Sequence, residues 1–179
     1  MKNLLFLFLA SLIVACNNDD GNNTPENPAE ALPPATLTGE GTFGCLIDGE
    51  PFFPGSGNDR PFAFYQLVRG AYTLGIGASR NDGGGENFVS IGMGALDIEV
   101  LQDTTYSLTT FESENFYGQY LLGGGIVLQT YTTEENPGTL TITNFTDEIV
   151  SGTFEFTVLD NDGTEIRITD GRFDLRYTN

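Results

Sequence analysis

The chain has no histidine and no tryptophan, and only two of its 179 residues are cysteine. Without histidine, neither a Ser-His-Asp nor a Cys-His nucleophile system can be built, and the commonest zinc ligand is missing. The lack of tryptophan removes the largest of the aromatic rings that sugar-binding surfaces display. We therefore expect no catalytic residue, no metal site and no cofactor, and we predict that the protein is not an enzyme.

Basic residues are also scarce, with 7 Lys and Arg against 25 Asp and Glu and a formal net charge of −18. This charge makes nucleic acid and anionic lipid headgroups poor partners, whereas divalent cations and cationic surfaces are better ones. An EF-hand at Asp160–Glu165 is excluded, because aligning Gly163 with its invariant glycine puts Val158 and Thr169 at the first and last ligand positions. An irregular calcium site in the acidic loops stays open.

One long apolar run is present, from Leu4 to Val14, just after Lys2. It is shorter than the roughly 20 residues that a membrane-spanning helix needs. A short apolar run behind a positive charge is typical of a secretion signal, so we predict a signal peptide over residues 1–15.

The end of this run, Ile13-Val14-Ala15-Cys16, resembles the lipobox of bacterial lipoproteins. The resemblance implies cleavage before Cys16, a diacylglyceryl thioether on its sulfur, and acylation of the new amine by a fatty acid such as palmitate. Two or three acyl chains hold a protein stably at a membrane. Membrane lipid, bound through Cys16, is therefore the first expected partner.

Polar residues follow the cysteine: Asn17, Asn18, Asp19 and Asp20. They resemble the export signal of Bacteroidota-type lipoproteins, which implies an outer-membrane location, on either the periplasmic or the cell-surface face. The same residues also suit the start of a solvated linker. Because residues 16–39 are poor in large apolar side chains, we predict a disordered leash there.

The remaining residues, 40–179, are predicted to form a single all-β domain. Apolar and polar residues alternate repeatedly with a period of two, and Gly, Asn and Asp interrupt the alternation. The pattern predicts an antiparallel β-sandwich or a partly closed β-barrel of about nine or ten strands. Strands are expected near 41–48, 62–69, 71–79, 86–95, 104–110, 125–132, 138–145, 150–158 and 165–177.

The last two of these strands carry the clearest signals. Asp162-Gly163 predicts a two-residue hairpin turn between them. After the turn, inward positions are even-numbered up to Ile168 and odd-numbered from Phe173. One residue must be inserted where the parity changes, and Asp170-Gly171 is the expected site of a bulge.

A glycine strip is expected where the strands near 71–79 and 86–95 pair. If Ile76 faces Ile91, Gly75 falls opposite Gly92 on the other face of the sheet. Glycine weakens a strand interior and often marks the close approach of another group. Either an aromatic side chain of the protein or a flat ligand could cover this strip.

Aromatic residues cluster in the segment from Glu112 to Tyr120. Tyr117 and Tyr120 could display their rings to a ligand, or they could pack in the core. We include them with Gly75 and Gly92 in a possible ligand surface. Cys45 is expected to be a small buried residue rather than a nucleophile, because no histidine can activate it.

The overall pattern resembles a family of Bacteroidota-type lipoproteins of unknown function. The resemblance rests on residues 41–52, 149–156 and 168–175, which are strand-and-turn motifs, so it implies a fold and no particular activity. We therefore predict an accessory or ligand-binding role in the cell envelope, with a glycan or another envelope protein as partner. A carboxylate-based glycoside hydrolase and a purely structural envelope protein are the alternatives.

Overall fold

A computed structural model describes residues 27–82, 87–124 and 127–179, and the regular elements of this part of the chain are β-strands apart from two short 3-10 helices. Its elements, in chain order, are η1 (Pro28–Ala31), β1 (Thr42–Ile47), β2 (Glu50–Phe52), η2 (Gly57–Asp59), β3 (Phe62–Val68), β4 (Ala71–Asn81), β5 (Phe88–Leu96), β6 (Thr104–Thr109), β7 (Phe116–Gly123), β8 (Leu128–Tyr131), β9 (Gly138–Phe145), β10 (Ile149–Leu159) and β11 (Glu165–Arg176).

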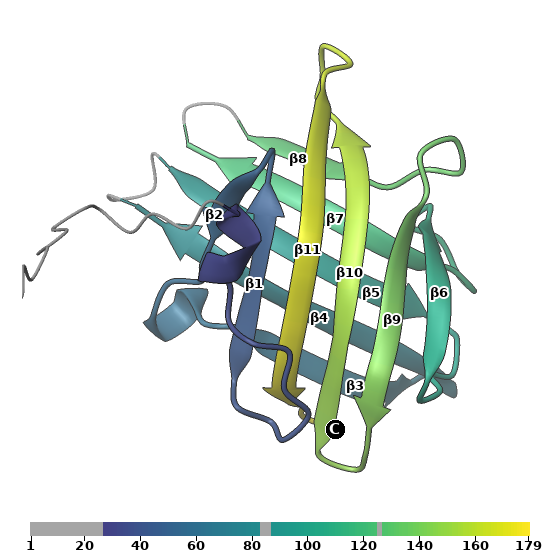
Figure 1. Cartoon of the computed structure of the whole chain (residues 1–179). Coiled ribbons are helices and arrows are strands. Elements are labelled where there is room, and N and C mark those ends of the chain that lie inside the picture. The colour runs from purple at the N-terminus through teal and green to yellow at the C-terminus, as the bar shows by residue number, and fades with distance from the viewer. Residues whose placement is uncertain (1–26, 83–86, 125–126) are drawn as a thin grey trace, which may run out of the picture.

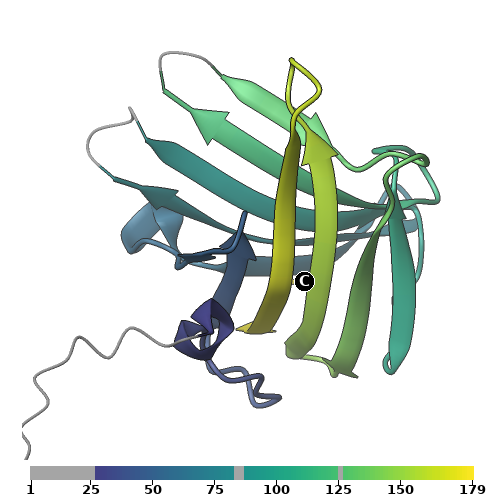
Figure 2. The same cartoon turned by 45° about the horizontal axis from the view of Figure 1, so that its top comes forward.

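The strands form one curled sheet in the order β2-β1-β11-β10-β9-β6-β7-β5-β4-β3, with β8 paired to β7. The curl folds the sheet into two layers whose strands cross steeply (Figures 1 and 2). We call β2, β1, β11, β10, β9 and β6 the front layer, and β8, β7, β5, β4 and β3 the back layer. The result is a half-barrel, which confirms the predicted all-β class.

Two strands and one pairing differ from the prediction. The sequence pattern predicts neither the short β2 nor β7, and it leaves the aromatic residues of β7 either on a ligand surface or in the core. The pair β6–β7 is parallel rather than antiparallel, although it spans only two residue pairs, Leu108–Phe116 and Thr109–Tyr117. This parallel contact links the two layers at a corner of the half-barrel.

The core fills the space between the layers and is lined by the predicted alternate residues of both. Phe154, Phe156 and Ile168 are all at most 4 % exposed. Cys45 is fully buried among them, and burial raises the pKa of its thiol to about 12 despite the nearby Arg80 guanidinium. A thiol with such a pKa is protonated at neutral pH and is a poor nucleophile.

The C-terminal hairpin follows the prediction at the bulge but differs from it at the turn. The expected bulge is present, because the β10–β11 register shifts between Phe154 and Phe156, opposite Asp170, which has a φ of 52°. The predicted two-residue turn is wrong. Asp160 pairs with Thr164 around a three-residue loop in which Gly163 has a φ of +80°, the usual combination of a type I turn and a left-handed glycine.

Residues 27–41, which we call the strap, contradict the prediction of a disordered leash through residue 39. Leu32 is only 6 % exposed and lies against Gly44 of β1. Asn27 caps the short helix η1 by accepting a hydrogen bond from the Ala29 amide. The strap then runs along the outer surface of the front layer (Figure 1).

The strap is fastened by Asp174, an outward-facing residue of β11 that the strap buries completely. The carboxylate accepts five hydrogen bonds. The donors are Thr36 Oγ1, Ser151 Oγ and the backbone amides of Thr38, Gly39 and Glu40, at 2.7–3.0 Å. Three of the five come from successive amides of the strap, so the carboxylate fixes the backbone just before β1.

Candidate functional site

Glycine and aromatic residues face one another across the back layer. In the observed register, Gly75 pairs with Gly94 and Gly77 with Gly92. The predicted pairing of Gly75 with Gly92 is therefore wrong by two residues, but the predicted glycine strip is present on the outer surface.

The protein's own rings cover most of this strip. Phe64 lies over Gly75, and Phe62 lies 3.1 Å from the position that a Cβ on Gly77 would take. Tyr117 similarly covers Gly94. Since these aromatic residues directly oppose the glycines in neighbouring strands, they fill the space that missing side chains leave. A flat ligand lying on Gly75 itself is thereby excluded.

Gly92 is the glycine of the strip that stays partly exposed, and it lies in a shallow hollow of about 100 Å³. The hollow is lined by Phe62, Phe64, Gly75, Ile76, Gly92, Met93, Tyr117 and Gln119. Two aromatic residues of β3 thus stand on one side, and a phenol and a carboxamide of β7 on the other. The lining is mostly apolar with a few polar groups, as in many small-molecule sites.

A second group of rings extends the surface beyond Tyr117. Phe111 and Tyr131 stack at 4.9 Å between centroids, and Phe111 contacts Tyr117 edge to face at 4.6 Å. Burial is the main cause that raises the pKa of Tyr117, and the neighbouring Tyr131 raises this pKa further. The Tyr117 hydroxyl therefore stays protonated at neutral pH and can donate a hydrogen bond. We call Phe62, Phe64, Phe111, Tyr117 and Tyr131 the outer aromatic face.

Three of the four predicted ligand-surface residues meet at this hollow: Tyr117, Gly75 and Gly92. The fourth prediction is wrong, because Tyr120 is only 7 % exposed and packs in the core. The difference follows from strand parity: 117 and 119 point outward from β7, whereas 116 and 120 point inward. Sequence reasoning missed Phe62 and Phe64, although their spacing of two residues marks one face of a strand.

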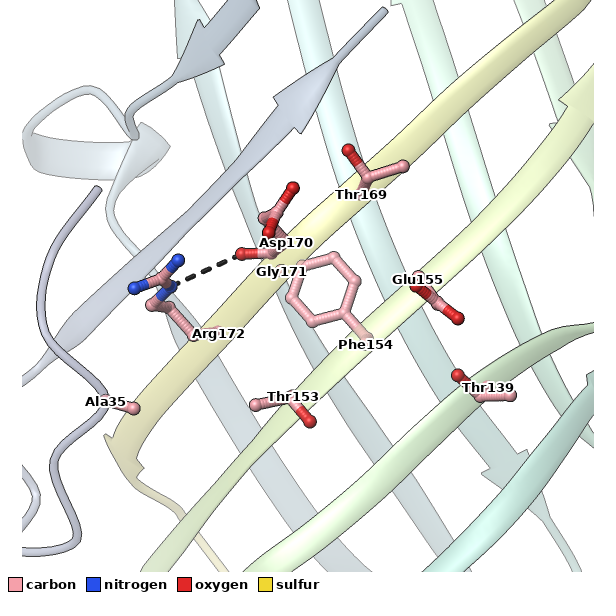
Figure 3. A pocket seen from close by; sticks show the side chains of 9 residues that line it. All are labelled: Ala35, Thr139, Thr153, Phe154, Glu155, Thr169, Asp170, Gly171 and Arg172. Atoms are coloured by element: carbon pink, nitrogen blue, oxygen red, sulfur yellow. Dashed lines mark hydrogen bonds between the residues drawn. The ribbon is translucent and has the colours of Figure 1, made fainter. Parts of the chain in front are cut away.

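A separate polar groove of about 410 Å³ crosses the outer surface of the front layer (Figure 3). Two carboxylates line it, Glu155 of β10 and Asp170 of β11. Figure 3 shows their side chains pointing away from each other. They therefore do not form the facing pair that flanks the scissile bond in glycosidases.

Within residues 27–82, 87–124 and 127–179, no three His, Cys, Asp or Glu side chains are grouped so that they could hold a metal ion. No helix among these residues is long and apolar enough to cross a membrane. The predicted signal peptide, Cys16 and the export signal Asn17–Asp20 lie outside the described residues.

The comparisons with known proteins add no assignment. No family model matches the chain, and neither a curated protein nor a solved structure matches it.

Proposed function

We propose that this chain is a lipid-anchored protein of the outer membrane whose β domain binds a glycan on the outer aromatic face without chemical turnover. The observation that carries the proposal is the exposure of the rings: Phe62 is 47 % exposed and Phe111 48 %, although each belongs to a packed group of aromatic residues. Large exposed apolar rings that gather on one face typically mark a binding surface.

The chemistry of the face suits a sugar ring. The rings of Phe62 and Phe64 are nearly parallel, 7° apart, with centroids 6.5 Å from each other. Such rings offer apolar contact to the C–H faces of pyranoses. Gln119 and the Tyr117 hydroxyl, which line the same hollow, add a carboxamide and a phenol that can bind sugar hydroxyls.

The glycan test uses the mature protein purified in detergent and a panel of envelope and host oligosaccharides. We expect Phe62→Ala to weaken binding at least about tenfold, since a lost ring contact of about 1.4 kcal/mol corresponds to that factor. Phe53→Ala is the matched control, because Phe53 is similarly exposed, at 41 %, but lies outside the outer aromatic face. Equal losses in both variants, or no glycan binding by the wild type, would contradict the proposal.

Gly92→Ala tests the hollow separately from protein stability. A Cβ there would be 3.6 Å from Gln119 Oε1 and 3.7 Å from the nearest backbone oxygen, which are ordinary contacts. We therefore expect a change of less than about 0.5 kcal/mol in unfolding free energy, together with weaker glycan binding because the methyl group fills the floor. Unchanged affinity, measured by calorimetry, would remove the hollow from the site.

Lipid anchoring has its own test, by intact-mass spectrometry of the native protein. We expect an N-terminus at Cys16 that carries two or three acyl chains. Cys16→Ser should move the protein from the membrane to the soluble fraction, whereas Cys45→Ala should leave it in the membrane fraction, because the Cys45 thiol is buried in the core. A native protein that retains residues 1–15, or lacks acyl mass, would refute the anchor.

A further inference from the structure

The polar groove of the front layer owes its shape to the bulge in β11. In a regular strand, successive side chains point to opposite faces. The extra residue at Asp170 lets Thr169, Asp170 and Arg172 all reach the outer surface, where Thr153 and Glu155 of β10 join them. Gly171 and its partner Phe154 both face the core, where the Phe154 ring lies against Gly171, so the outer surface between Thr169 and Arg172 carries only the polar side chains (Figure 3).

Arg172 is oriented by a hydrogen bond to the backbone. Its Nε donates to the backbone oxygen of Asp170 at 3.3 Å, while no ion pair to it is found among the described residues. By contrast, Arg80, Arg167 and Arg176 each pair with a carboxylate at 2.7 Å or less. In a chain with a charge of −18, a half-buried arginine without such a partner is available to an external anion.

The opposite charge lies across the groove. Figure 3 places Arg172 and Glu155 on opposite sides of the Phe154 ring. Arg172 of β11 pairs in register with Thr153 of β10, and Glu155 lies two residues beyond Thr153. The side chains of Arg172 and Glu155 are therefore offset by about 7 Å along the strand direction. Glu155 also lacks an ion-pair partner within the part of the chain described.

We propose that this groove binds a short zwitterion of about dipeptide length, with its carboxylate on Arg172 and its ammonium group on Glu155. Asp170 provides a second carboxylate in the same groove. A simple anion would be repelled by the two carboxylates of the groove, and a simple cation would be repelled by Arg172. A zwitterion places an opposite charge against each of these groups. The hydroxyls of Thr139, Thr153 and Thr169 line the path between the ends and can bind the peptide amide.

Calorimetric titration with glycine, diglycine and triglycine measures the length that the groove accepts, using the detergent-purified mature protein. We expect diglycine to bind at least about tenfold more tightly than glycine. N-acetyl-diglycine and diglycine amide, which each lack one charge, should bind at least about tenfold more weakly than diglycine. No binding of any zwitterion up to about 10 mM, or equal binding of the blocked peptides, overturns the proposal.

Variants then identify the two ends. Arg172→Gln and Glu155→Gln should each weaken diglycine binding at least about tenfold. Arg167→Gln is the matched control, because Arg167 lies on the same strand but pairs with Glu165. Unchanged affinity in both groove variants would refute the assignment. Glycan binding should survive in both, because neither residue lies on the outer aromatic face, so this site and the glycan site can fail independently.

Discussion

Asp174→Asn is expected to lower the unfolding free energy by about 3 kcal/mol, which is about 10 °C in melting temperature for a domain of this size. One carboxylate oxygen accepts from Thr36, Thr38 and Glu40, and the other accepts from Gly39 and Ser151. Asparagine keeps the shape but turns one acceptor oxygen into an N–H donor that faces other donors. The Ser151 and Thr36 hydroxyls can reverse and accept from this N–H, but a backbone amide cannot, so at least one amide hydrogen bond is replaced by two donors that face each other in a buried site.

Thermal and urea unfolding measure this loss, with Asp147→Asn as the control. Asp147 is an exposed carboxylate in the turn before β10, so the same change there should alter the unfolding free energy by less than about 0.5 kcal/mol. Hydrogen exchange gives a local measurement, because the amides of Thr38, Gly39 and Glu40 should exchange faster in the Asp174 variant. If these amides stay equally protected, Asp174 does not hold the strap.

The same carboxylate makes stability depend on pH. Burial raises the pKa of Asp174, but hydrogen bonds from Ser151, Thr36 and the amides of Glu40 and Gly39 outweigh it and lower the pKa from 3.8 to about 2. The folded state thus binds the proton less tightly than the unfolded state does. The resulting contribution, about 2 kcal/mol, is present above about pH 4 and is lost as the pH falls towards 2.

Urea unfolding between pH 5 and pH 2 tests this contribution. The wild type should lose it in that range, whereas Asp174→Asn has no carboxyl group to titrate at this position. The stability difference between the two proteins should therefore shrink by about 2 kcal/mol on acidification. A difference that stays constant across the range would contradict the role of the ionised carboxylate.

The strap was not predictable from local sequence, because what orders it is remote and polar. Asp174 lies 134 to 138 residues from the strap groups that it binds. Residues 27–39 contain few apolar side chains, and such a composition predicts disorder. Local composition carries no information about a distant carboxylate that accepts hydrogen bonds from the backbone amides of this segment. The bulge at Asp170, in contrast, was predictable, since a change of parity within one strand is visible in the sequence alone.

The aromatic face was partly predictable for a related reason. A shift of one residue would move every side chain of a strand to the other face, but a shift of two leaves the faces unchanged. Alternation therefore identified the outward glycines of β4 and β5 correctly and left their register undetermined. The position of Tyr120 was predicted wrongly because β7 was not identified as a strand. Only within a strand do odd and even positions point to opposite faces, which places Tyr117 on the outer surface and Tyr120 in the core.

Gly152→Ala is expected to lower the unfolding free energy by about 3 to 4 kcal/mol. A Cβ on Gly152 would collide with the backbone oxygen of Thr141 in β9, and it would lie 2.9 Å from Cζ of Phe173. A backbone oxygen within a sheet cannot turn aside as a flexible side chain can. The strain should therefore separate β9 from β10 at the register shift beside Ser151.

Gly92→Ala provides the control for this substitution, because it also adds one methyl group to a strand glycine but meets nothing closer than 3.6 Å. The intrinsic preference of alanine over glycine is similar at both positions, so the difference in melting temperature isolates the packing conflict. Ser151 precedes Gly152 and donates to Asp174, so the strap amides should also lose protection in Gly152→Ala. Equal melting temperatures for the two variants would show that the β9–β10 contact can relax, and that the glycine is not required there.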